Sequence, residues 1–250
     1  MFQTDPAKLS AETVLPTMYD LPSEDPEEPG LPDEFHILQP SLLRETFRPP
    51  HHPQDQIFVA TDLNLYYDQR HTLWHKRPDW FAVLGANRMY RDGNLRLSYV
   101  IWQELVSPFI VVELLSPGTE DEDLGNKLRD AEQPPGKWEV YERILKIPYY
   151  AVFDRYNYKF QMFELRDGRY IEAKVTNDRF WIPELELGLG VWEGSYDQTP
   201  EMLWLRWYDA TGNWVLRSDE VERQRADAEK LQKERLIAQL RALGIEPDLI

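Results

Sequence analysis

The sequence predicts an α/β (α+β) fold that ends in a long charged helix, and three observations indicate it. Residues 109–115 (FIVVELL) form a nearly continuous apolar run, which is typical of a strand buried on both faces of a sheet. Residues 138–145 (WEVYERIL) carry apolar side chains at helical spacing. Residues 217–243 are rich in Glu, Arg, Lys, Ala and Leu and contain neither proline nor glycine, which predicts a helix of about seven turns.

Composition divides the chain into three parts. Residues 1–36 are acidic and proline-rich and are expected to form an irregular arm, since proline removes a backbone donor and restricts its neighbour. Residues 37–216 are expected to form the core domain, and residues 217–250 the charged helix. The apolar positions of that helix fall on two stripes, so a coiled coil is only weakly indicated; the stripes are Val221, Ala228 and Leu231, and Leu236, Leu240 and Leu243.

Within the core, a short helix is predicted at residues 40–46, where a proline precedes SLLRETF, which itself begins with a serine. Strands are predicted from β-branched and aromatic residues, or from buried-looking apolar runs, at 56–67, 80–84, 109–115 and 149–153. Two hairpins are predicted around glycine-containing turns, pairing 159–165 with 169–174 and 202–208 with 213–216. The glycine-rich segment 183–194 (PELELGLGVWEG) is expected at the edge of the sheet, and residues 121–130 are expected to begin a further helix with acids in its first turn.

Composition also limits the class of protein. No apolar run approaches the roughly 20 residues that span a bilayer, and no secretory signal is visible at the N-terminus. The chain has no cysteine, which excludes disulfides and thiolate metal sites. We therefore expect a cytoplasmic protein without a membrane partner.

The net charge of −16 argues against a nucleic-acid partner, because such binding draws on Lys and Arg at phosphates. The charge is uneven, however. Residues 1–36 contain nine acids and one base, Lys8, and so carry half of the excess. The remainder of the chain therefore repels phosphate less than the total net charge suggests.

The candidate chemistry lies in RPDWFAVLG and VVELLSPGTEDEDLGNK. Glu113 interrupts a strongly apolar strand, and a buried carboxylate is costly unless it is paired or binds a cation. Two carboxylates, a backbone carbonyl and water suit Mg²⁺ or Mn²⁺. The simpler alternatives remain open: Asp79 as a turn residue, Glu113 in a structural ion pair, and Lys127 as a solvated helix lysine.

These segments resemble the Uma-type family of putative restriction endonucleases, in the PD-(D/E)xK nuclease superfamily. The resemblance rests on Pro78-Asp79, on VVELLSP at 111–117, on the segment with Asp123 and Lys127, and on KWEVYERILKIPYYAVFDRY at 137–156. It implies a restriction-endonuclease-like mixed central sheet flanked by helices.

The resemblance also implies a metal-dependent endonuclease that cleaves DNA. Asp79 and Glu113 would be the catalytic carboxylates and, with the backbone carbonyl of Leu114, would bind Mg²⁺ or Mn²⁺. Leu115 stands where the superfamily places its lysine, which points to Lys127 on the following segment. A further acid from the first helix is not recognisable; Glu34 and Glu45 are the available ones.

Other patterns favour structural roles. His71 and His75 have zinc-ligand spacing but no third ligand in view, and His51-His52 lies among prolines. Four aromatic residues could stack on bases, but at strand spacing they favour the core; they are Trp204, Trp207, Tyr208 and Trp214. The alternative to an endonuclease is a catalytically silent, nuclease-like binding or assembly module that acts through the acidic arm and the C-terminal helix, compatible with a homo-oligomer.

Overall fold

The computed structural model describes residues 15–17, 20, 34–115, 123–125 and 133–242. Its α-helices are α1 (Phe35–Thr46), α2 (Ile101–Glu104), α4 (Lys137–Glu139) and α5 (Ser218–Ala242). The shorter helical turns are η2 (Gln54–Gln56), η3 (Arg91–Gly93), η4 (Val140–Ile144) and η5 (Pro183–Leu185). The strands are β1 (Ile57–Ala60), β2 (Leu65–Tyr66), β3 (His75–Lys76), β4 (Trp80–Leu84), β5 (Tyr99–Val100), β6 (Ile110–Leu114), β7 (Tyr149–Asp154), β8 (Lys159–Arg166), β9 (Arg169–Ala173), β10 (Arg179–Ile182), β11 (Leu187–Gly194) and β12 (Met202–Tyr208).

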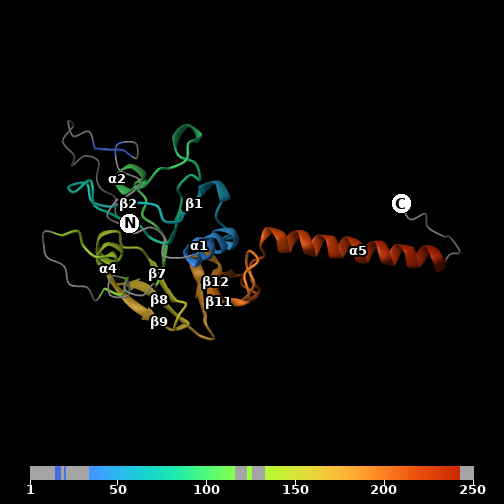
Figure 1. Cartoon of the computed structure of the whole chain (residues 1–250). Coiled ribbons are helices and arrows are strands. Elements are labelled where there is room, and N and C mark those ends of the chain that lie inside the picture. The colour runs from blue at the N-terminus through green and yellow to red at the C-terminus, as the bar shows by residue number, and fades with distance from the viewer. Residues whose placement is uncertain (1–14, 18–19, 21–33, 116–122, 126–132, 243–250) are drawn as a thin grey trace.

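A six-stranded mixed sheet forms the centre of the molecule, in the order β1-β4-β6-β7-β8-β9. Strands β6 and β7 are parallel and the other neighbours are antiparallel. Two three-stranded sheets accompany it, β10-β11-β12 and β3-β2-β5. The expectation of an α/β fold with a mixed central sheet and a long C-terminal helix is confirmed (Figure 1).

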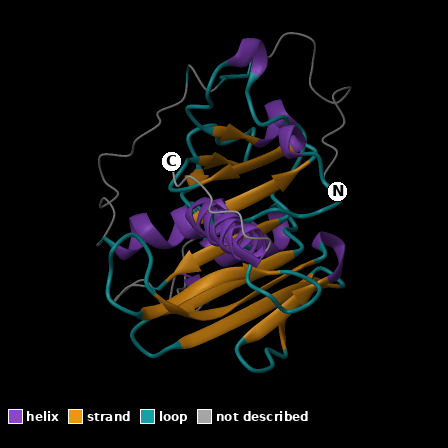
Figure 2. Ribbon diagram, turned by 90° about the vertical axis from the view of Figure 1, so that its right-hand side faces the viewer, coloured by secondary structure: helices purple, strands orange, loops and turns teal. Residues whose placement is uncertain are grey.

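Both faces of the central sheet are covered. Alternate side chains of a strand point to opposite faces, so β6 sends Ile110, Val112 and Leu114 into a core shared with α1 and the β10-β11-β12 sheet. Val111 points the other way, into a core that contains η4 side chains and part of the small β3-β2-β5 sheet. Glu113 belongs to this second face. Figure 2 looks nearly along α5, with the strands behind it.

Several predicted elements lie where the sequence indicated, including β4, β6, β7 and the β8–β9 hairpin. That hairpin turns at Asp167 and Gly168, both with positive φ, as a tight two-residue turn requires. Trp204, Trp207 and Tyr208 are buried and contribute to the core, as their spacing favoured. His71 and His75 belong to a loop and to β3 respectively, and His71 stacks on Trp74 at 3.8 Å between ring centroids.

Other predictions were wrong in their details. The continuous strand predicted at 56–67 is two strands separated by a turn, with Asp62 at positive φ. The segment 183–194 does not lie at a sheet edge, because β11 is the central strand of its sheet. Its glycines allow this: a side chain at Gly188 would collide with the ring of Tyr208 on the neighbouring strand. Residues 213–216 form only an isolated bridge, Tyr208 to Trp214, rather than a strand.

Helix α1 begins at Phe35, five residues before the predicted start, and includes Pro40. An internal proline costs a helix about 3 kcal/mol through a lost hydrogen bond and a steric clash. The extra turn nevertheless forms because it buries Phe35, His36 and Gln39. Residues 35 and 36 therefore belong to the folded body and not to the acidic arm.

Gln39 attaches α1 to β12. Its Nε2 donates to the carbonyl of Leu205 at 2.8 Å, and its Oε1 accepts from the Leu205 amide at 2.8 Å. Gln39 and Leu205 are both fully buried. The side chain thus continues the β12 hydrogen-bonding pattern into the helix.

Replacing Gln39 with alanine is expected to lower the free energy of unfolding by about 2 kcal/mol, because it leaves a buried donor and a buried acceptor without partners. Urea unfolding followed by circular dichroism measures the change. Ser41→Ala on the same helix is the control, since Ser41 is exposed and bonds only within α1. Equal stability of the two variants would contradict the role given to Gln39.

Helix α5 extends away from the strands (Figure 1), and none of its residues is buried. Its first turn is attached firmly: buried Arg206 pairs with Glu220 and donates to the carbonyl of Val215 at 2.8 Å. Glu45 accepts a hydrogen bond from the Ser218 amide at 2.9 Å. Among the described residues, no helix is both long and apolar enough to cross a membrane.

Candidate active site

Asp79 and Glu113 lie side by side on neighbouring antiparallel strands. Asp79 directly precedes β4, and Glu113 is the fourth residue of β6; the two strands pair with Trp80 opposite Val112. The Asp79 amide donates to Glu113 Oε2 at 3.3 Å, and the Leu114 amide donates to Asp79 Oδ2 at 2.6 Å. The ends of the two strands are therefore joined through their acidic side chains as well as their backbones.

Lys137, at the start of α4, bridges two carboxylates. Its Nζ lies 3.0 Å from Glu113 Oε2 and 3.0 Å from Asp123 Oδ1. Tyr141, one turn further along, donates from its hydroxyl to Glu113 Oε1 at 2.8 Å. Both oxygens of the fully buried Glu113 are thus held from the segment that covers this face of the sheet.

That segment is not a regular helix. The predicted helix at 138–145 is one α-helical turn followed by a π-helical turn, with the Leu145 amide bonded to the Val140 carbonyl at 2.8 Å. Single π-turns within helices frequently occur at functional sites. Here Lys137 and Tyr141 point to the same carboxylate.

Asp123 completes the cluster. It is buried, and its carbonyl accepts from the Tyr150 hydroxyl at 2.9 Å. Its Oδ1 is buried and accepts no hydrogen bond within the described part of the chain, although the Lys137 ammonium lies 3.0 Å away. The Lys137 ammonium is therefore the cation that compensates this buried carboxylate.

Several pKa values at the site are shifted because the side chains are buried and three acids surround one lysine. Burial raises the pKa of Glu113 well above its ordinary value, with Lys137 opposing the rise and the neighbouring acids adding to it. Burial likewise raises the pKa of Asp79, against the opposing effect of Lys137. Burial alone would lower the pKa of Lys137, but Glu113, Asp123 and Asp79 together raise it well above its ordinary value. The lysine therefore stays protonated at neutral pH.

His36 also lies at the site, and no pattern in the sequence predicts it. Its Nε2 lies 3.1 Å from the carbonyl oxygen of Leu114, and the residue is almost fully buried. A carbonyl oxygen can only accept, so this contact is a hydrogen bond when Nε2 carries the proton. His36 is on the first helix, the element from which a further acid, Glu34 or Glu45, was expected. Glu45 instead contacts the start of α5, and Glu34 is exposed.

Lys127, the lysine predicted from the resemblance, lies outside the described residues. Lys137 is the lysine that the structure brings to Glu113. The signal for it was present: Lys137 opens the resembling segment 137–156 and precedes Tyr141 by four residues, which places both on one helical face.

The oxygen atoms at this site are of the kind that bind a divalent metal. Among the described residues, no three His, Asp or Glu side chains already form a metal-binding group. Mg²⁺, however, usually binds proteins through only one or two carboxylates and completes its shell with water and substrate phosphate. Asp79, Glu113 and the Leu114 carbonyl supply such a set, and the excess of acid over base favours a cation. The donor set fits.

The chain is similar to a protein family and to a solved structure. One solved structure that matches is a putative nuclease belonging to DUF820 from Anabaena variabilis ATCC 29413, with a TM-score of 0.43 and 10% identity over 62% of this chain and 76% of that chain. None of the curated proteins matches the chain. The Uma2 family model, described as "Putative restriction endonuclease", matches residues 16–198. This match covers most of the chain, which therefore belongs to the Uma2 family.

Proposed function

We propose that the protein is a metal-dependent nuclease that hydrolyses phosphodiester bonds of DNA. The observation that carries the proposal is the pair of adjacent carboxylates, Asp79 and Glu113, held in a largely buried cluster against a lysine that stays protonated. Membership in a family described as restriction endonucleases supports the same reaction. A purely structural ion pair would not need three acids around one base.

In this proposal Asp79, Glu113 and the Leu114 carbonyl hold Mg²⁺ or Mn²⁺. When bound, the metal supplies a water of lowered pKa and neutralises negative charge on the phosphate. Tyr141 orients the Glu113 carboxylate by donating to Oε1, and His36 orients the Leu114 carbonyl. These positioning contacts fix the donors before substrate arrives, which lowers the cost of reorganisation.

Lys137 has the role of a fixed cation. Because its pKa is raised by the surrounding carboxylates, it does not act as a general base at neutral pH. A protonated lysine beside the metal ligands instead stabilises negative charge that develops on the phosphate during hydrolysis. Its ion pair with Asp123 holds the ammonium in place.

The experiment is a Mg²⁺ and Mn²⁺ titration by calorimetry together with a cleavage assay on single- and double-stranded DNA. The wild type is expected to bind metal and to cut DNA only when metal is present. Asp79→Asn keeps the size of the side chain and is expected to lose both properties. Asp209→Asn, on an exposed turn, is the control. Uncut DNA with the wild type under both metals would refute the proposal.

A silent assembly module remains the second candidate, and the exposure of the whole of α5 favours it. The same titration separates the two. A module would leave DNA intact in both metals, and its wild type and Asp79→Asn forms would have the same metal affinity.

A further inference from the structure

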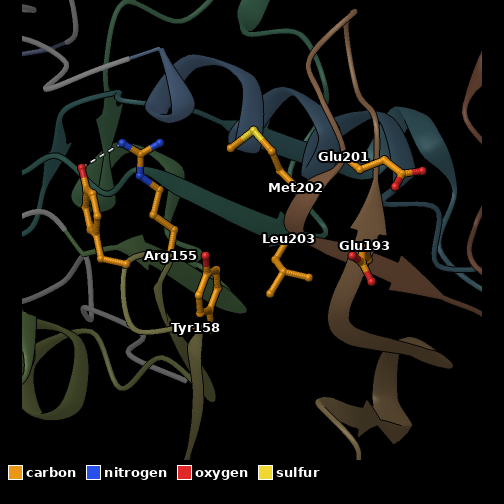
Figure 3. Close-up of a pocket in the computed structure, with 7 residues that line it drawn as sticks. Arg155, Tyr158, Glu193, Glu201, Met202 and Leu203 are labelled. Carbon is orange, nitrogen blue, oxygen red and sulfur yellow. Dashed lines mark hydrogen bonds between the residues drawn. The ribbon is translucent and has the colours of Figure 1, made fainter.

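A cavity of about 630 Å³ lies between the β7–β8 turn and the β11–β12 hairpin. This volume is within the range of small-ligand sites. Figure 3 shows Arg155 and Tyr158 on one side, Glu193 and Glu201 on the other, and the apolar side chains of Met202 and Leu203 between them. One wall thus offers a cation and an aromatic ring, and the other offers two carboxylates.

The cavity lies at the same end of the central sheet as Asp79 and Glu113. Arg155 directly follows β7, which runs parallel to β6, so it leaves the central sheet at the same edge as Leu114. Its guanidinium lies 4.8 Å from the centre of the Phe35 ring, and the next residue, His36, contacts the Leu114 carbonyl. Phe35 and His36, consecutive residues of α1, thus contact Arg155 at the cavity and the Leu114 carbonyl at the site respectively.

The wall with the aromatic ring is held in a fixed shape. The carboxylate of Asp154 accepts from the amides of Tyr156 and Asn157 at 2.9 and 3.0 Å, which fixes the turn. Arg155 lies over the ring of Tyr156 at 4.6 Å and donates to its hydroxyl at 2.8 Å. Tyr158 has a left-handed backbone with φ of 55°, a conformation that is uncommon for a large side chain. Its ring is presented to solvent, with 67% of the residue exposed.

We propose that this cavity binds an unpaired nucleobase of the DNA substrate, at the same end of the central sheet as the proposed cleavage site. The base stacks on Tyr158, its sugar-phosphate faces Arg155, and its amino-bearing edge donates to Glu193 or Glu201. This inference rests on the proposed nuclease function and names the part of the substrate that the site reads.

The carboxylates determine which bases fit. A carboxylate only accepts hydrogen bonds, so it pairs with the exocyclic amino groups of cytosine, adenine and guanine. Thymine has no amino group, and its single N–H lies between two carbonyl oxygens that repel a carboxylate. Recognition through stacking and amino groups also suits an acidic protein better than recognition through phosphates alone, since Arg155 is the only basic side chain among the described residues that line the cavity.

The test is the binding of labelled 12-residue oligo(dC), oligo(dA) and oligo(dT), followed by fluorescence anisotropy in EDTA. The wild type is expected to bind oligo(dC) and oligo(dA) several-fold more tightly than oligo(dT). Tyr158→Asn removes the ring, while asparagine tolerates the left-handed backbone. Loss of one stacking contact is expected to weaken oligo(dC) binding about tenfold, whereas Tyr158→Phe keeps the ring and stays within about twofold of the wild type.

The paired substitution Glu193→Gln with Glu201→Gln tests the carboxylates. Glutamine both donates and accepts, so the discrimination against oligo(dT) is expected to disappear. Glu222→Gln on α5 is the matched control, and it should leave the preference unchanged because Glu222 is exposed and distant from the cavity.

The inference is overturned if Tyr158→Asn binds oligo(dC) as tightly as the wild type, if oligo(dT) binds equally well, or if no oligonucleotide binds. EDTA keeps these outcomes separate from the nuclease proposal. If the wild type does not cleave DNA but binds the oligonucleotides in the expected order, the nuclease proposal is refuted and the cavity assignment stands. Metal-dependent cleavage that survives Tyr158→Asn with unchanged affinity refutes only the cavity assignment.

Discussion

Lys137→Met is expected to lower the free energy of unfolding by about 3–5 kcal/mol at pH 8, the cost of breaking a buried ion pair by removing one partner. Methionine keeps most of the side-chain volume, so the loss reports charge rather than packing. Glu113 and Asp123 would be left buried beside Asp79 without a compensating cation. The destabilisation should shrink towards pH 5, because Glu113, with its raised pKa, can then accept a proton.

The same substitution is expected to reduce metal-dependent DNA cleavage by about 10²–10³-fold, the effect of removing one group that stabilises transition-state charge. Urea unfolding at pH 5 and pH 8 measures the stability, and single-turnover cleavage measures the activity. Lys137→Arg separates the two effects, since arginine restores a permanent charge but places it differently.

Lys127→Met is the informative control. The resemblance to the family points to Lys127, and the geometry points to Lys137. If Lys127→Met loses cleavage while Lys137→Met keeps it, the role assigned to Lys137 is wrong. Full activity of Lys127→Met together with loss of activity in Lys137→Met would identify Lys137 as the lysine that cleavage requires.

The fold was largely predictable because its signals are local. The apolar run of β6, the tight turn of the β8–β9 hairpin and the composition of α5 each fix an element within a few neighbouring residues. Helix α1 was less predictable: the proline at position 40 argues locally for a later start, and burial of Phe35 and Gln39 by strands distant in sequence outweighs it. The central position of β11 likewise depends on contacts that no local pattern encodes.

The candidate site was predictable in part for the same reason. Glu113 is conspicuous because a carboxylate interrupts a buried strand, and Asp79 follows from its place in the resembling motif. Lys137 and His36 reach the site from segments 24 and 78 residues away in the chain. Their convergence is a property of the packed sheet and its covering segments. The place of Lys137 at the start of the resembling segment 137–156 was a signal for that residue, whereas no local pattern reveals His36.

Glu113→Gln is expected to have opposite effects on activity and stability. It removes a proposed metal ligand, so metal-dependent cleavage and stabilisation by Mg²⁺ should both be lost. Without metal, however, it removes one of three negative charges around a single lysine. The glutamine oxygen can still accept from Lys137 and from the Asp79 amide, and its NH2 group can donate to the Tyr141 hydroxyl oxygen, which reverses that hydrogen bond. The variant should therefore unfold at a higher temperature than the wild type in EDTA. Replacing a residue that serves function at the expense of stability often has this effect.

The pH dependence of stability independently gives the direction of the stability change expected for Glu113→Gln. Burial raises the pKa of Glu113 in the folded state above its ordinary value of 4.5, so the folded protein holds a proton that the unfolded chain has already released. Stability that depends on this group must then fall as the pH rises above about 4.5. Carboxyls with lowered pKa, such as Asp154 and Glu220, act in the opposite direction and below this range. The difference in unfolding free energy between Glu113→Gln and the wild type should therefore grow from pH 4.5 to pH 8 in EDTA and shrink when Mg²⁺ is added. A wild type that is the more stable protein at pH 8 in EDTA would mean that Glu113 serves mainly as the structural partner of Lys137.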